Sequence, residues 1–142
     1  METSHKRRFV AAIAGLTFSL AACDKLYSYS RTAKVAPLPT SDCVEAVLSM
    51  MKVTNRIDSG SRDPRFYSPT SGLPDVVFRL VDEGKQQTFE QSFNSIGPTY
   101  PEEKLRIVRD RMKSVEQEVI ASCGARLLEP PVFCDMSRCQ SD

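Results

Sequence analysis

Residues 99–124 read TYPEEKLRIVRDRMKSVEQEVIASCG, and this stretch decides the fold class. Thr99 and Glu102 resemble a capping box, and Pro101 suits a first helical turn. Gly124, directly after Cys123, suits a helix C-cap. Between these ends, apolar residues recur at steps of three and four, as Leu105, Val108, Met112, Val115 and Val119. This spacing predicts a helix with one buried face, which ends near Cys123.

A second, shorter helix is predicted for residues 41–52. Thr40 or Ser41 can cap its first turn, and Asp42 and Glu45 suit the positive end of the helix dipole. A buried stripe at helical spacing is formed by Val44, Val47, Leu48 and Met51.

A β-hairpin is predicted between the two helices. The first strand covers residues 75–81, and its inward face carries Val76, Phe78 and Leu80. Residues 82–85 (DEGK) suit a tight turn because Gly84 can take a positive φ. Residues 86–96 then return as the partner strand, with aromatic side chains on the same face at Phe89 and Phe93. A helical spacing also fits this segment, through Phe89, Phe93 and Ile96.

Two further segments show no regular apolar pattern. Residues 24–39 (DKLYSYSRTAKVAPLP) predict a flexible tether with a span of roughly 20–25 Å. Residues 55–74 are rich in Gly, Pro and Ser and predict a long loop. Arginine and aromatic side chains are enriched at interfaces, so the loop is our candidate partner contact, through Arg56, Arg62, Arg65, Phe66 and Tyr67. The alternative is that Phe66 or Tyr67 packs onto the core.

The predicted elements form one small α+β domain over residues 40–142, stapled by disulfides. Two antiparallel helices would cover one face of a short antiparallel sheet. The order would be α–β–β–α–(β), where the last strand covers residues 125–128 and ends before Pro130 and Pro131. A single domain suits a chain of 142 residues.

The first 23 residues have the pattern of an export signal. Lys6, Arg7 and Arg8 precede the apolar residues 9–20, a run too short to span a bilayer as a helix. Residues 20–23, Leu-Ala-Ala-Cys, resemble the lipobox of bacterial lipoproteins. The resemblance implies cleavage before Cys23 and a diacylglyceryl group on the Cys23 sulfur. In such lipoproteins the new N-terminus is commonly acylated as well. Several acyl chains together anchor a protein permanently.

The lipobox also implies a location. After removal of residues 1–22, residues 23–39 would form the lipidated tether and the domain would face the periplasm or the cell surface. Asp24 resembles an inner-membrane retention signal of some enteric bacteria, but Lys25 does not reinforce it, so either envelope membrane stays open. The alternative is a simple secreted protein in which Cys23 is an ordinary cysteine.

Cysteine counting agrees with lipid on Cys23, because it leaves four of the five cysteines. An even number in an oxidising compartment predicts disulfides. Cys43 opens the first predicted helix and Cys123 closes the second, so antiparallel packing would bring them together. Of the three possible pairings we therefore prefer Cys43–Cys123 with Cys134–Cys139. A zinc site is disfavoured because only the last two have the spacing of a ligand pair.

The chemistry left to the mature chain is narrow. The only histidine is His5, which leaves with the leader, and its loss excludes histidine catalysis and histidine-ligated zinc. No nucleotide-binding glycine motif is present, and we predict no cofactor. Residues 1–22 carry three basic and one acidic side chain, so removing them changes 19 basic and 18 acidic residues to 16 and 17. A near-neutral chain has no general attraction to nucleic acid.

Three functions are compatible with this chemistry. The leading hypothesis is a non-enzymatic binding or accessory module whose partners are the membrane, through the lipid, and an envelope protein. The second is a carboxylate-dependent hydrolase of envelope glycans, with candidate groups at Asp75, Asp82, Glu83 and Glu90. We favour ordinary turn and surface charges for these four. The third is a carrier of a small ligand or lipid between helices and sheet.

An anionic partner could also meet Arg106, Arg109 and Lys113, although a solvated helix face is favoured.

Overall fold

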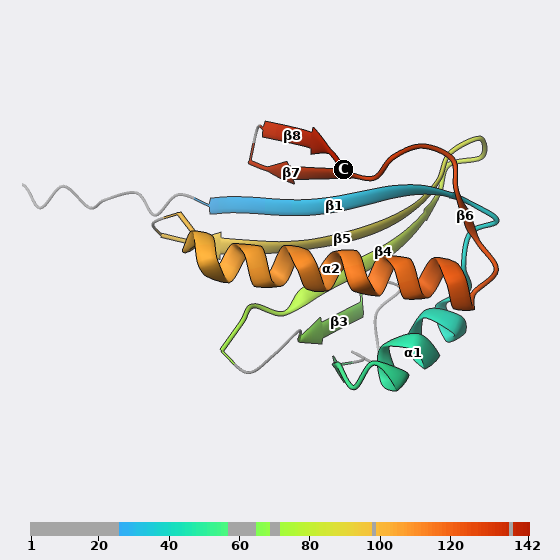
Figure 1. The fold of residues 1–142 in the computed structure, drawn as a ribbon, viewed down its shortest axis with the longest axis horizontal. Coiled ribbons are helices and arrows are strands. Elements are labelled where there is room, and N and C mark those ends of the chain that lie inside the picture. Colours follow the sequence, from blue (N-terminus) through green and yellow to red (C-terminus); the bar gives the residue numbers. More distant parts are fainter. Residues whose placement is uncertain (1–25, 57–64, 69–71, 98, 137) are drawn as a thin grey trace, which may run out of the picture.

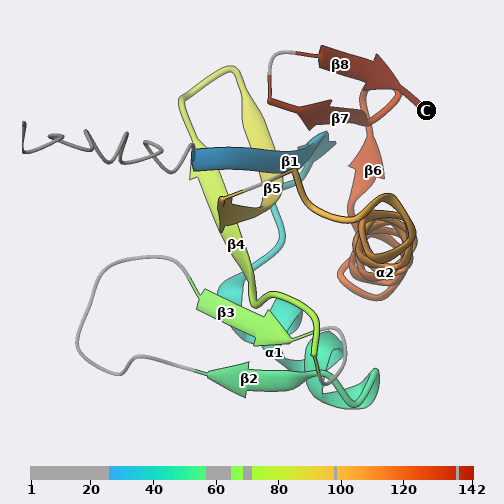
Figure 2. The same ribbon diagram turned by 90° about the vertical axis from the view of Figure 1, so that its left-hand side faces the viewer.

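The computed structural model describes residues 26–56, 65–68, 72–97, 99–136 and 138–142. Within them the order is β1 (Leu26–Ala36), α1 (Ser41–Met50), β2 (Thr54–Arg56), β3 (Arg65–Ser68), β4 (Val76–Asp82), β5 (Gln87–Ile96), α2 (Glu102–Ser122), β6 (Arg126–Leu127), β7 (Val132–Asp135) and β8 (Arg138–Ser141). The strands form one antiparallel sheet in the order β2-β3-β4-β5-β1-β7-β8, with β6 paired to β1. Figures 1 and 2 show α2 lying along one face of this sheet, with α1 near the C-terminal end of α2. The predicted class, a small α+β domain, is confirmed.

β1 is the largest departure from the predicted fold, because the tether prediction is wrong for residues 26–36. The strand lies inside the sheet, paired with β5 on one side and with β7 and β6 on the other. Every second side chain, from Tyr29 through Arg31 and Ala33 to Val35, is buried. This two-residue period is that of a strand with one face on the core. The described domain therefore begins at Leu26 and has a strand before α1.

The predicted hairpin is confirmed. β4 and β5 pair from Val77↔Ser92 to Asp82↔Gln87, and Gly84 in their turn has a φ of 73°. Alternate residues of β5 are buried, which settles the open choice between strand and helix in favour of a strand. The opposite face of β5 is half-exposed and polar, as expected where an antiparallel sheet meets water on one side.

The predicted loop over residues 55–74 is only partly correct. β2 and β3 pair with each other there, and β3 continues the sheet beyond β4. Residues 57–64 and 69–71 lie outside the described residues. The prediction missed these strands because they contain three and four residues, too few to show a period.

The helix ends follow the sequence at two points and depart from it at one. In α1 the Thr40 Oγ1 accepts a hydrogen bond from the Cys43 backbone N–H at 3.3 Å. Gly124 follows α2 with a φ of 67°, and the short strand β6 comes next. The capping box of Thr99 and Glu102 is wrong. Pro101 holds the N-cap position, which leaves the Thr99 side chain outside the capping geometry.

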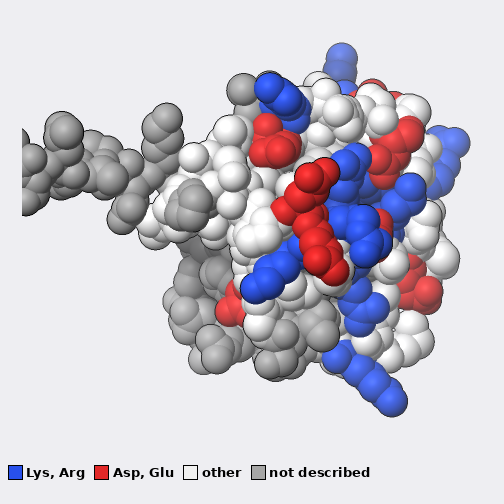
Figure 3. Space-filling view, turned by 60° about the vertical axis from the view of Figure 1, so that its left-hand side comes forward, with Lys and Arg blue, Asp and Glu red and all other residues white. Residues whose placement is uncertain are grey.

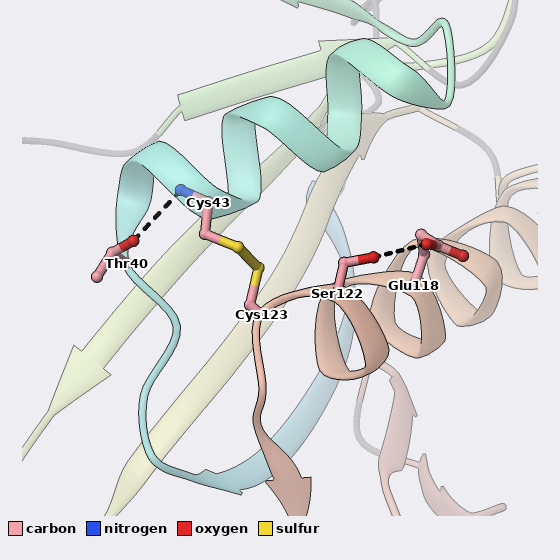
Figure 4. The surroundings of a disulfide bond; sticks show 5 residues. All are labelled: Thr40, Cys43, Glu118, Ser122 and Cys123. Atoms are coloured by element: carbon pink, nitrogen blue, oxygen red, sulfur yellow. Dashed lines mark hydrogen bonds between the residues drawn. A yellow bond between two sulfur atoms is a disulfide. The ribbon is translucent and has the colours of Figure 1, made fainter.

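Both disulfides connect the predicted cysteines. Cys43 at the start of α1 bonds to Cys123 at the end of α2, with Cα atoms 5.9 Å apart (Figure 4). The start of α1 and the end of α2 lie at the same end of the molecule (Figure 1). Cys134 bonds to Cys139, and these residues face each other across β7 and β8. The C-terminal segment is therefore a hairpin closed by a disulfide.

Candidate functional site

An ion pair lies between α2 and the sheet. The Arg31 guanidinium on β1 donates to both carboxylate oxygens of Glu116 on α2, from Nε at 2.8 Å and from Nη2 at 2.9 Å. Arg31 Nη1 also donates to the Asp142 Oδ2 at 2.6 Å. The Arg31 and Glu116 side chains are almost completely buried, whereas that of Asp142 keeps some contact with water. We call Arg31, Glu116 and Asp142 the Arg31 cluster.

The local sequence places these charges inward. Glu116 lies four residues after Met112 and three before Val119, so it belongs to the buried face of α2. Arg31 stands between Tyr29 and Ala33 on the inward face of β1. Sequence reasoning missed both residues, although a charge inside an apolar stripe is a usable signal. Such a charge requires a counter-charge on the element that it faces.

Burial and charge act against each other in the cluster. Burial raises the pKa of Glu116 and outweighs the hydrogen bonds from Arg31, which lower it. Burial lowers the pKa of Arg31, but hydrogen bonds to Glu116 and Asp142 outweigh it, so the guanidinium stays charged. Because Glu116 is sealed from solvent and held by both oxygens, its carboxyl cannot reach a dissolved substrate. The cluster is suited to fixing α2 on the sheet rather than to acid–base catalysis.

A second polar network lies beside the first. The Tyr67 hydroxyl donates to the Gln91 Oε1, and Gln91 Nε2 donates to the Met112 carbonyl at 2.9 Å. Gln91 faces Arg31 across β5 and β1, so the two networks are neighbours. Burial, the largest effect, raises the pKa of Tyr67 far above its usual value. Tyr67 is thus a core residue, and its predicted role in partner contact is wrong.

The rest of the predicted contact surface is placed only in part. Arg56 is the last residue of β2, and Arg65 and Phe66 begin β3. Arg62 lies outside the described residues. The prediction of an Arg and aromatic contact surface therefore stays open for these four. The alternative of an aromatic residue that packs back onto the core is confirmed for Tyr67.

The basic side of α2 is engaged mainly within the molecule. The Arg109 guanidinium lies 4.5 Å from the centre of the Phe133 ring and 3.6 Å from the Asp142 carboxylate. Lys113 Nζ is 3.4 Å from Asp142, and Arg106 pairs with Asp110 at 3.6 Å. Figure 3 shows that Lys and Arg side chains gather on one face with Asp and Glu side chains among them. This mixed surface has no single-sign field to attract an anionic partner.

The four candidate carboxylates do not form a buried pair. Asp82 and Glu83 are exposed at the turn between β4 and β5, and Asp75 is exposed just before β4. Glu90 is half-exposed on the outer face of β5, opposite Arg79 of β4. Glu116, which is not one of these four, is the buried carboxyl group whose pKa is raised by burial.

Within the described ranges no group of three or more His, Cys, Asp or Glu side chains could hold a metal ion. No helix in that part of the chain is long and apolar enough to cross a bilayer.

Comparison with known proteins identifies no family. No protein-family model matches the chain, and no curated protein sequence matches it. Among solved structures, a similar chain is the phosphoglucomutase pp63/parafusin from Paramecium in its open form. It shares 9% sequence identity with a TM-score of 0.36, over 82% of this chain and 23% of that one. The chain thus spans about a quarter of that enzyme, and a likeness at this level identifies neither its fold family nor its function.

Proposed function

We propose that the chain is a bacterial envelope lipoprotein, anchored through lipid on Cys23, whose domain is a non-enzymatic binding or accessory module. The observation that carries this proposal is the sequence of the first 23 residues. A basic flank, a short apolar run and Leu20-Ala21-Ala22-Cys23 follow each other in the order that lipid attachment requires.

The disulfides support an exported domain. Cys43–Cys123 and Cys134–Cys139 use the four cysteines other than Cys23. Disulfides persist in oxidising compartments such as the periplasm and the cell surface, and they are rare in the reducing cytosol. Cys23 is thereby left as the one cysteine for lipid.

Binding is favoured over catalysis by the way in which reactive groups are used. The mature chain would contain no histidine, since His5 leaves with the leader. Glu116, whose raised pKa would suit a general acid, is enclosed by its pair with Arg31. Asp82 and Glu83 stand on an exposed turn, where water surrounds them and no cleft among the described residues encloses a bound substrate between them. A partner of the module would therefore be bound through surface contacts.

Metabolic labelling with palmitate tests the anchor. The parent protein should incorporate label and Cys23→Ser should not. The matched control is the double variant Cys134→Ser/Cys139→Ser, which removes two other cysteines and should label like the parent. Equal labelling of the parent and Cys23→Ser would overturn the lipoprotein assignment.

Photo-cross-linking in intact envelopes tests the binding role. A photoreactive residue is placed at Arg106 on the outer side of α2 in one variant and at Leu128, beyond β6, in another. Both side chains are exposed, so neither substitution should disturb the core. A discrete protein adduct from either position supports a binding module. Lipid-labelled protein that forms no adduct from either position contradicts it.

A further inference from the structure

We propose that the end of the sheet that carries Leu26, Ile96 and Met136 lies against the lipid surface, so that the domain stands on the bilayer in one orientation. We call these three residues the apolar tip. The inference rests on the lipid anchor proposed for Cys23 and adds which part of the domain meets the membrane.

The chain between the anchor and the domain is short. β1 begins at Leu26, three residues after Cys23. Three residues span at most about 10 Å when fully extended. β1 alone, with 11 residues, is about 36 Å long at the usual rise of a strand. The anchor therefore cannot lift the domain off the membrane, and the end where β1 begins must be the near end.

The end of the sheet where β1 begins is apolar. Leu26 is 64% exposed and Ile96 is 71% exposed, and they face each other as the last pair of β1 and β5. Met136 is 51% exposed, and its backbone N–H donates to the Ser28 carbonyl of β1. Figure 1 shows the start of β1, the end of β5 and the end of β7 at the same end of the sheet. Three large apolar side chains in water are thus gathered where the lipid must be.

Neighbouring aromatic residues fit the same surface. Tyr27 follows Leu26 and is half-buried. Tyr100 lies between β5 and α2, with its ring against those of Phe93 and Tyr29. Tyrosines are enriched at the level of lipid headgroups because the ring is apolar and the hydroxyl is polar.

Charge at this end does not favour an anionic surface. Glu102 and Glu103 are exposed in the first turn of α2. Asp135 faces Arg138 across β7 and β8, so these two charges offset each other. The contact is therefore apolar, and zwitterionic lipid is sufficient for it. A polybasic contact would instead require anionic headgroups.

Tryptophan fluorescence provides the test because the chain contains no tryptophan. The lipidated full chain is reconstituted in phosphatidylcholine vesicles with and without bromine on the acyl chains, as Ile96→Trp and as Met136→Trp. Ile96 and Met136 are far from Cys23 in the sequence, so the anchor alone does not hold them near the lipid. Quenching at these positions therefore reports the orientation of the domain on the bilayer. The matched control is Leu128→Trp, because Leu128 is 52% exposed and Met136 is 51% exposed. The backbone N–H of Leu128 donates to the Lys34 carbonyl, whereas that of Met136 donates to the Ser28 carbonyl. Lys34 and Ser28 are six residues apart on β1, so these two contacts lie about 20 Å from each other.

Brominated lipid should reduce the fluorescence of both tip variants by about half, since their indoles would lie within roughly 10 Å of the headgroup boundary. It should leave Leu128→Trp unchanged. Floating vesicles that carry the protein but quench neither tip variant would overturn the orientation and leave the lipid anchor standing. A blue-shifted tip tryptophan without bromine quenching would mean that a protein covers the tip, which also overturns the inference. Protein that does not float with vesicles would overturn the anchor and the orientation together.

Discussion

Arg31 and Glu116 join the middle of the sheet to α2 through two parallel hydrogen bonds of 2.8 and 2.9 Å. The residues are 85 positions apart in the sequence, and both side chains are buried. A buried charge finds its partner only when β1 has its native register and α2 its native rotation. The pair therefore couples these two choices, at the desolvation cost that any buried ion pair carries.

Removing one member of this pair should destabilise the protein more than removing both. Glu116→Leu leaves Asp142 as the remaining counter-charge in contact with the buried Arg31. We expect the free energy of unfolding to fall by about 3–5 kcal/mol. The double variant Arg31→Leu/Glu116→Leu should recover most of that loss because no uncompensated charge remains. Urea unfolding measures each value.

The control for this prediction is Asp110→Asn, which breaks the exposed pair with Arg106. Exposed pairs contribute little, so its unfolding curve should overlie that of the parent. If Glu116→Leu were no more destabilising than this control, the pair would not have the role given to it.

Asp142 makes stability depend on pH. Burial acts to raise the pKa of its carboxyl group. The hydrogen bond from Arg31 and the charges of Arg31 and Lys113 lower this pKa by more, so the net pKa lies below the usual value. This carboxylate therefore stabilises the fold fully above its unfolded pKa of about 4, and the contribution is lost as pH falls through the lower folded value. Asp142→Asn should lower the free energy of unfolding at neutral pH, and the difference from the parent should close in strong acid. A difference that stays constant over a pH series of urea titrations would contradict this account.

The two disulfides should differ in their contribution to stability. Cys43–Cys123 closes a loop with a sequence separation of 80, and Cys134–Cys139 closes one with a separation of 5. Loop-closure entropy gives about 4–5 kcal/mol for the long bridge and about 2 for the short one. Replacing each pair by alanines and comparing the unfolding free energies checks this order, and the two double variants are controls for each other. Equal losses would show that loop length does not set the contribution.

Tyr67 is predicted to matter for folding and not for partner contact. Tyr67→Phe keeps the ring but removes the hydroxyl that donates to Gln91, so a buried acceptor loses its partner. We expect a loss of about 1–3 kcal/mol of unfolding free energy. Adducts from the cross-linker at Arg106 or Leu128 should be unchanged in this variant. Loss of the adducts with unchanged stability would return Tyr67 to the contact surface.

The sequence predicted those elements whose pattern is local. The stripe of α2, the turn at Gly84 and the pairing of Cys43 with Cys123 each follow from residues near in sequence or from two helix ends. β1 was missed because its inward positions include Arg31, which looks like a surface residue. Its burial depends on Glu116, and that dependence cannot be seen within the strand.

The polar core was missed because a polar side chain was expected to face water. Gln91 looks like an outward residue between Phe89 and Phe93, yet its amide is satisfied by Tyr67 from one side and by the Met112 carbonyl from the other. The two-residue period of a strand places such a polar side chain on the same face as its apolar neighbours, whatever its polarity. A buried polar group then needs a hydrogen-bond partner.

Substitutions at two neighbouring residues of β1 test whether this segment is a strand of the sheet or a flexible tether. Ala33 is fully buried on the inner face, whereas Thr32 lies on the outer face opposite Glu90. Ala33→Lys would place an unpaired ammonium in the core, and we expect several kcal/mol of destabilisation or loss of the folded state. Thr32→Lys would face a carboxylate across the strands and should be neutral or stabilising by up to about 1 kcal/mol. Amide NMR spectra and urea unfolding distinguish the two variants. A flexible tether would tolerate both lysines equally, so equal behaviour would remove β1 from the sheet, while opposite behaviour fixes both its membership and its register.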